Sequence, residues 1–106
     1  MLDLSANQIT VIQPGTFANL PKLGKLFLNH NQMRMIPPGL FANIPQLKEL
    51  ILSFNQVTKI QSGTFSNLPR LEKLVLAANQ IAVIQEGAFS YPKKLRRLDL
   101  KLNKMS

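Results

Sequence analysis

The chain contains no cysteine and no tryptophan, and it has only one histidine among 106 residues. The absence of cysteine excludes disulfides, thiol nucleophiles and cysteine metal sites. Long apolar runs are also absent: the longest, Leu74 to Ala78, is far shorter than the ~20 residues of a membrane-spanning helix. We therefore expect no membrane-spanning segment. The start of the chain also lacks the basic and apolar stretches of a signal peptide, so none is expected there.

Acidic residues are scarce, because five Asp and Glu stand against thirteen Lys and Arg, a formal charge of +8. With a single histidine, His30, and dispersed acids, the chain offers no catalytic triad, no tetrahedral nitrogen or sulfur site and no acid-rich calcium cage. We expect His30 to be a surface polar residue. The sequence therefore predicts a protein that is not an enzyme and has no catalytic residue, no metal site and no cofactor.

A 24-residue repeat runs through the whole chain. Five columns keep this spacing: Leu2, Leu26, Leu50, Leu74 and Leu98; Leu4, Leu28, Leu52, Leu76 and Leu100; Asn7, Asn31, Asn55, Asn79 and Asn103; Gly15, Gly39, Gly63 and Gly87; Phe17, Phe41, Phe65 and Phe89. A period of this length is typical of solenoids, in which each unit stacks on the next. We expect one array over 1–106, with repeats at about 2–25, 26–49, 50–73 and 74–97 and a partial repeat at 98–106.

Each column has a physical role. The Leu-x-Leu alternation predicts a short strand with both leucines on one face, and strands that return once per repeat must be parallel. The asparagine at the strand's end is expected to bond backbone groups of its own turn and of the neighbouring turn. The glycine suits a tight turn, and the phenylalanine is expected to fill the back of the coil.

These motifs resemble the leucine-rich repeat superfamily, specifically its 24-residue "typical" class, found mostly in extracellular proteins. The matching stretches are 26–31, 50–55 and 74–79, each followed by Ile-x-x-Gly-x-Phe. The resemblance implies an α/β repeat solenoid: a right-handed coil with a concave parallel β-sheet and short helical, 3₁₀ or irregular segments on the convex side. It also implies an extracellular or secreted location. Variable lymphocyte receptors, Toll-like receptor ectodomains and small leucine-rich proteoglycans are similar in appearance.

Two features depart from those ectodomains. The cysteine-rich caps usual at both ends are missing, and the fourth repeat has Tyr91-Pro92-Lys93 where the third has Asn67-Leu68-Pro69. Uncapped solenoid ends expose core residues and unpaired strand edges, so end-to-end self-association is expected. The chain is interpreted either as a fragment of a longer receptor or as a repeat-only protein.

The residues between the repeated leucines are expected to line the concave surface. Phe27, Ile51 and Val75 fall next to one another there, with Phe54 close by. Such residue types also suit strands, but a contiguous exposed apolar patch more often marks a contact site. We therefore predict ligand binding by Phe27, Ile51, Val75, Phe54, Lys25, Lys73 and Arg97.

The positive charge is concentrated just before each strand and in the last repeat. Residues 93–104 hold six Lys and Arg against Asp99, a net charge of +5. This cluster is either a solubilising flank or an attractor for anionic polymers, whose binding would weaken with salt. On the second reading, anionic-polymer binding is predicted for Lys93, Lys94, Arg96 and Lys101.

Three functions are compatible with the sequence. The favoured one, implied by the resemblance, is innate-immune pattern recognition of anionic bacterial surface components such as lipopolysaccharide or lipoteichoic acid. The alternative is a protein–protein interaction module of a receptor or matrix proteoglycan-like protein. A third is a structural or engineered repeat scaffold without a ligand of its own. Specific nucleic-acid binding is not expected, because no recognition helix, RNA-binding sheet motif or zinc finger is present.

Overall fold

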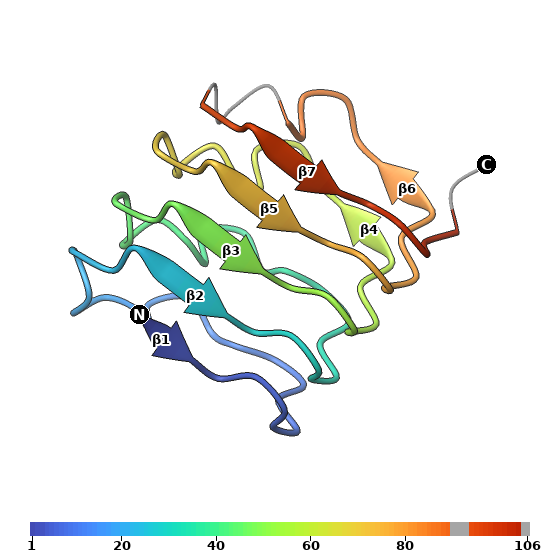
Figure 1. Ribbon diagram of the computed structural model, residues 1–106, viewed down its shortest axis with the longest axis horizontal. Helices are drawn as coiled ribbons and strands as arrows, with labels where there is room; N and C mark the ends of the chain where they lie inside the picture. The colour runs from blue at the N-terminus through green and yellow to red at the C-terminus, as the bar shows by residue number, and fades with distance from the viewer. Residues whose placement is uncertain (90–93, 105–106) are drawn as a thin grey trace.

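A computed structural model describes residues 1–89 and 94–104 as a right-handed solenoid with a concave parallel sheet (Figure 1). Each repeat contributes one short strand to this concave sheet, in which the strands are ordered β1-β2-β3-β5-β7. Leu50 pairs with Leu26 on one side and with Leu74 on the other, so the strands repeat with the 24-residue spacing of the sequence. The strands are β1 (Leu2–Asp3), β2 (Lys25–Phe27), β3 (Glu49–Ile51), β5 (Lys73–Val75) and β7 (Arg97–Asp99).

The segments that return behind the sheet are irregular. No helix occurs in the described part of the chain, so the irregular alternative is observed and the helical and 3₁₀ ones are not. Each segment is a series of separate turns, such as those closed by Ala18 N–H to Gly15 C=O and Leu20 N–H to Phe17 C=O. A left-handed glycine, such as Gly63 at φ 78°, recurs in every one of them and interrupts helical geometry.

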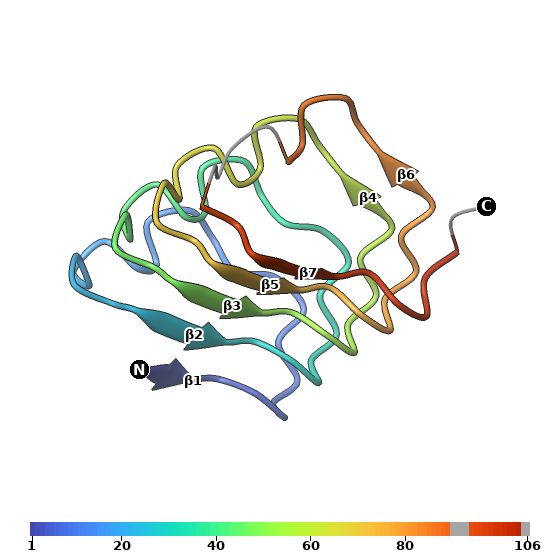
Figure 2. The same ribbon diagram turned by 45° about the horizontal axis from the view of Figure 1, so that its top comes forward.

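A second, two-stranded parallel sheet lies on the far side of the coil from the main one (Figure 2). It pairs β4 (Lys59–Ile60) with β6 (Val83–Ile84). Ile60 is buried, whereas Lys59 and Val83 face outward and are exposed. The sequence did not predict this sheet.

The core lies between the concave sheet and the returning segments. Leucines of the central strands are fully buried, and the phenylalanine rings stack behind them at centroid distances of 6.1 Å (Phe41–Phe65) and 5.8 Å (Phe65–Phe89). At the last strand the leucine column is less covered, and Leu98 is 38% exposed. Burial therefore comes from neighbouring repeats, as expected for a solenoid.

The asparagine column connects successive turns as the sequence predicts. The Asn55 side-chain oxygen accepts from the Met33 N–H at 3.0 Å. Its amide nitrogen donates to the carbonyls of Leu28 and Leu52, both at 3.0 Å. Asn31 and Asn79 are equally buried and make equivalent bonds. Buried backbone groups of two repeats are thereby satisfied by one side chain.

Gly63→Ala is expected to lower the free energy of unfolding by about 1–2 kcal/mol, because the new side chain must adopt a left-handed backbone. A Cβ there would meet only Ser66 Oγ at 3.8 Å, so backbone strain rather than a clash causes the loss. Urea denaturation measures the difference. The matched control is Gly24→Ala, whose site is open and not left-handed; an equal loss there would contradict the assignment.

Candidate functional site

The main sheet carries an apolar patch along the middle of its concave face. The strand register aligns Phe27, Ile51 and Val75, and all three are half-buried. Asp3 and Asp99 continue the same column on the first and last strands. The structure thus brings the predicted apolar residues together between two acids.

Both of these acids are held by their own turns. Asp3 Oδ1 accepts from the Ser5 hydroxyl at 2.5 Å and from the Ser5 N–H at 2.9 Å. These bonds, the hydroxyl first, lower the pKa of the Asp3 carboxyl below its usual range. Asp99 Oδ1 likewise accepts from the Lys101 N–H at 3.0 Å. Fixed carboxylates therefore border the apolar patch at each end.

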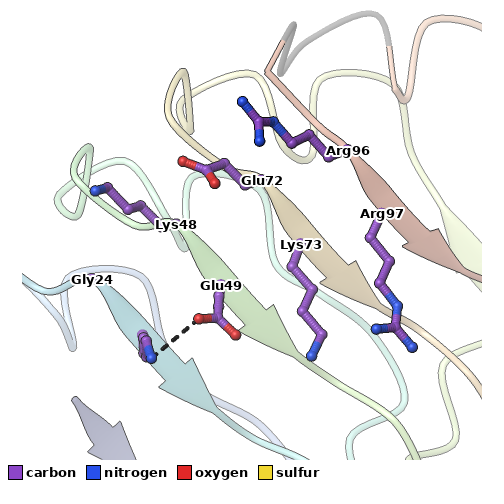
Figure 3. A pocket seen from close by; sticks show the side chains of 8 residues that line it. Gly24, Lys48, Glu49, Glu72, Lys73, Arg96 and Arg97 are labelled. Atoms are coloured by element: carbon purple, nitrogen blue, oxygen red, sulfur yellow. Dashed lines mark ion pairs between the residues drawn. The ribbon is translucent and has the colours of Figure 1, made fainter.

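A shallow groove runs across the N-terminal ends of the strands, with a volume of about 400 Å³ (Figure 3). We call it the strand-start groove. Backbone groups that border the groove bond to one another: the Gly24 C=O accepts from both the Lys48 N–H and the Glu49 N–H. The side chains that line it, together with Gly24, are Lys25, Lys48, Glu49, Glu72, Lys73, Arg96 and Arg97.

Five cations oppose two acids in the strand-start groove. The only ion pair within the described residues joins Lys25 Nζ to Glu49 Oε2 at 3.3 Å. Lys73 and Arg97, paired in register, extend beside each other, and neither is bonded to an acid in the same described set (Figure 3). Toward the last strand, Arg96 and Arg97 are both exposed, and neither is paired with an acid among the described residues.

The predicted anionic-polymer residues are divided by the structure. Lys94 and Arg96 share a second shallow groove with Glu72 and so extend the strand-start groove. Lys101 follows the C-terminal end of β7, at the other end of the strands. Lys93 lies outside the described residues.

Sequence reasoning missed several residues of this region. Lys48, Glu49 and Glu72 line the strand-start groove but were not predicted to bind ligand. The 24-residue period could have identified them. Each residue is either the first residue of a strand or the residue just before it, and the equivalent residues of the other repeats lie beside it.

The residue before each repeated asparagine forms a left-handed column. Its φ values lie between 55° and 60°, a conformation unusual for side chains other than glycine. In this column the Phe54 ring stacks on His30, with centroids 4.4 Å apart and planes at 11°. The sequence placed these two side by side but did not predict the stacking. The column comprises Ala6, His30, Phe54, Ala78 and Leu102.

The described residues contain no group of three or more histidine or acidic side chains placed to hold a metal ion. Within the same residues, no helix is long and apolar enough to cross a membrane.

The repeat, the strand register and the asparagine column agree with a family match. Residues 1–57 and 45–105 each match the family described as leucine rich repeat. The chain belongs to the leucine-rich repeat family. No curated protein is similar enough in sequence to count as a match.

Three solved structures show which leucine-rich repeat proteins this chain resembles. The TLR13–ssRNA13 complex matches with a TM-score of 0.95 and 33% identity over 98% of the chain. The leucine-rich repeat domain of APL1B gives 0.94 and 30% over 98%, and Toll of Drosophila, in complex with Spatzle, gives 0.82 and 33% over 85%. The chain spans 15%, 31% and 12% of those respective chains. It is therefore similar to a short part of each.

Proposed function

We propose that this leucine-rich repeat chain is a non-enzymatic, extracellular innate-immune recognition module that binds anionic bacterial surface components such as lipopolysaccharide or lipoteichoic acid. One observation carries the proposal: a groove with an excess of cations lies beside a half-buried apolar patch on the same concave face. The similarity to Toll and TLR13 supports a recognition role.

The two surfaces bind different parts of the ligand. Phosphate groups of the ligand pair with Arg96 and Arg97, because a guanidinium binds phosphate in a bidentate manner. Lys25 contributes less, since it already pairs with Glu49. Acyl chains or other apolar parts rest on Phe27, Ile51 and Val75. An amphiphilic anion uses both surfaces at once, whereas a purely polar anion uses only the groove.

A protein ligand is the second candidate. The apolar patch favours it, because exposed contiguous apolar surface marks protein contact sites, and the Toll structure is a complex with Spatzle. The double variant Phe27→Asp, Ile51→Asp separates the two candidates. It abolishes binding to a protein ligand and weakens an amphiphilic anion, so the separating probe is a glycerol phosphate oligomer without acyl chains, whose salt-sensitive binding the variant retains.

Arg96→Glu with Arg97→Glu is expected to weaken binding to lipoteichoic acid or lipopolysaccharide micelles at least about tenfold. The matched control is Arg34→Glu with Lys59→Glu, which changes the net charge equally. Both of these residues are exposed; Lys59 belongs to the second sheet, and Arg34 lines a different groove. Binding is measured by titration at about 50 and about 200 mM salt, and it should weaken steeply at the higher concentration. Equal loss in both variants would show that only total charge matters.

A further inference from the structure

The His30–Phe54 pair is a fixed aromatic surface on the rim of the concave face. The two rings lie nearly parallel at 4.4 Å, and the identical φ of 57° at both residues directs both side chains the same way. His30 is held further by the Asn29 amide, whose nitrogen lies 3.1 Å from His30 Nδ1. One face of the Phe54 ring is therefore covered by His30, and the opposite face points along the column toward the next repeat.

The next repeat places only a methyl group in front of that face. The bonds Phe54 N–H to Ala77 C=O and Ala78 N–H to Lys101 C=O set Phe54, Ala78 and Leu102 on successive turns. Two strand spacings, about 10 Å, separate the backbones of the outer two. Phe54 is 50% exposed and Leu102 is 77% exposed, so neither covers the other across the alanine. A further ring has room to stack on Phe54 at the spacing that His30 already has.

The charges around this position select the kind of ring. Lys101 directly precedes Leu102, Lys104 follows it by two residues, and both lysines are exposed. The neighbouring acid, Asp99, is already bonded to the Lys101 N–H. The Ala78 side chain offers no hydrogen bond to the edge of a nucleobase, but its methyl group suits a hydrocarbon ring. The surroundings therefore favour an aromatic side chain with negative charge beside it.

From this we infer a second binding site, separate from the strand-start groove: the free face of Phe54, above Ala78 and beside Leu102, takes an aromatic side chain from an acidic segment of a partner protein. Stacking on Phe54 provides the anchor, and Lys101 and Lys104 pair with the flanking carboxylates. The site lies at the C-terminal ends of the strands, whereas the strand-start groove lies at their N-terminal ends, so each can fail without the other.

The test uses a synthetic pentapeptide with a central tryptophan between two acidic residues on each side. Because the chain has no tryptophan, peptide fluorescence reports binding directly. Phe54→Leu keeps an apolar side chain but removes the ring. Ala78→Leu places a larger side chain over the free face of Phe54. The left-handed backbone of this column accepts leucine, because Leu102 already has that conformation. We expect each variant to weaken peptide binding about fivefold or more, whereas Val83→Ala, at an equally exposed apolar residue of the second sheet, should leave it unchanged. In an NMR titration of the native protein, peptide binding is expected to shift the Ala78 methyl signal upfield, which places the tryptophan ring above Ala78.

Four outcomes would overturn the inference, the last of them through the role assigned to the lysines. The first is native affinity in both Phe54→Leu and Ala78→Leu. The second is equal competition by the same peptide with alanine in place of tryptophan, which would reduce the interaction to charge alone. The third is displacement of the tryptophan peptide by adenosine monophosphate at a concentration below the dissociation constant of the peptide, which would make the Phe54 ring a nucleotide site. A lysine-flanked tryptophan peptide that binds as tightly would contradict the role of Lys101 and Lys104.

Discussion

Asn55→Ala is expected to lower the free energy of unfolding by about 2–4 kcal/mol, a large effect for one polar side chain. The substitution leaves the buried Met33 N–H without its partner. It also removes one of two side-chain amide bonds from each of the Leu28 and Leu52 carbonyls, which still accept from Asn31 and Asn79. Water cannot replace the Asn55 amide there, because Asn55 is only 6% exposed. An unsatisfied buried N–H costs about 1–3 kcal/mol and each lost hydrogen bond about 0.5–1.5 kcal/mol, although the effects do not add fully.

Urea denaturation of Asn55→Ala and of Asn7→Ala measures this directly. Asn7 occupies the same column but is exposed, and its amide bonds only the carbonyls of Leu4 and Ser5 in its own turn. We expect a loss below about 1 kcal/mol for Asn7→Ala. Equal losses in the two variants would show that the asparagine acts within its own turn and does not connect successive repeats.

Leu52→Ala is expected to cost about 2–5 kcal/mol, because it removes a fully buried side chain from the centre of the array. The cavity affects two interfaces, since the third repeat packs against a neighbour on each side. Leu50→Ala, within β3 itself, is expected to cost a similar amount, because Leu50 is equally buried. Thermal and urea unfolding of the variants give the loss.

The matched control for Leu52→Ala is Leu100→Ala, in the same column, directly after the last strand. Leu100 is only half-buried, so less apolar area is lost, and only one described neighbouring repeat packs against it. We expect a loss about half as large or smaller. A cooperative transition with an unchanged midpoint for Leu52→Ala would contradict the packing.

The repeated columns of the sequence predicted the concave half of the fold almost completely. Because the period is constant, a residue and its copy 24 positions later must be lateral neighbours, which sets the pairing of Phe27 with Ile51 and of Ile51 with Val75. The role of the asparagines followed from their place at the strand ends, where buried backbone groups need partners. Strand register and side-chain direction are both consequences of the period.

The convex side and the rim could not be predicted in the same way. Proline and glycine mark turns but allow several local geometries, so the sequence left helical and irregular segments open. The period also makes Ile60 and Ile84 lateral neighbours, but it does not specify that they pair as strands, and the matching residues Ile12 and Ile36 lie in no strand. The stacking of Phe54 on His30 follows from a left-handed backbone at non-glycine residues, for which the sequence carries only a weak signal.

The charged residues show a similar limit. The net charge of residues 93–104 located the cationic excess, but it grouped Lys101 with Lys94 and Arg96. In the structure β7 separates Lys101 from the other two. The period places Glu49 beside Lys25, but it does not specify that these two form an ion pair at 3.3 Å. Lateral contacts between repeats decide which charges act together.

Chemical-shift mapping of backbone amides during titration with a short glycerol phosphate oligomer tests most directly whether the concave face is the recognition surface. The oligomer represents the polyanionic part of lipoteichoic acid and is small enough for well-resolved spectra. The shifts are expected to concentrate at the strand-start groove, at Lys73, Arg96 and Arg97, and to disappear at high salt. Shifts concentrated at Arg34, Lys59 and Val83, on the other side of the coil, would contradict it.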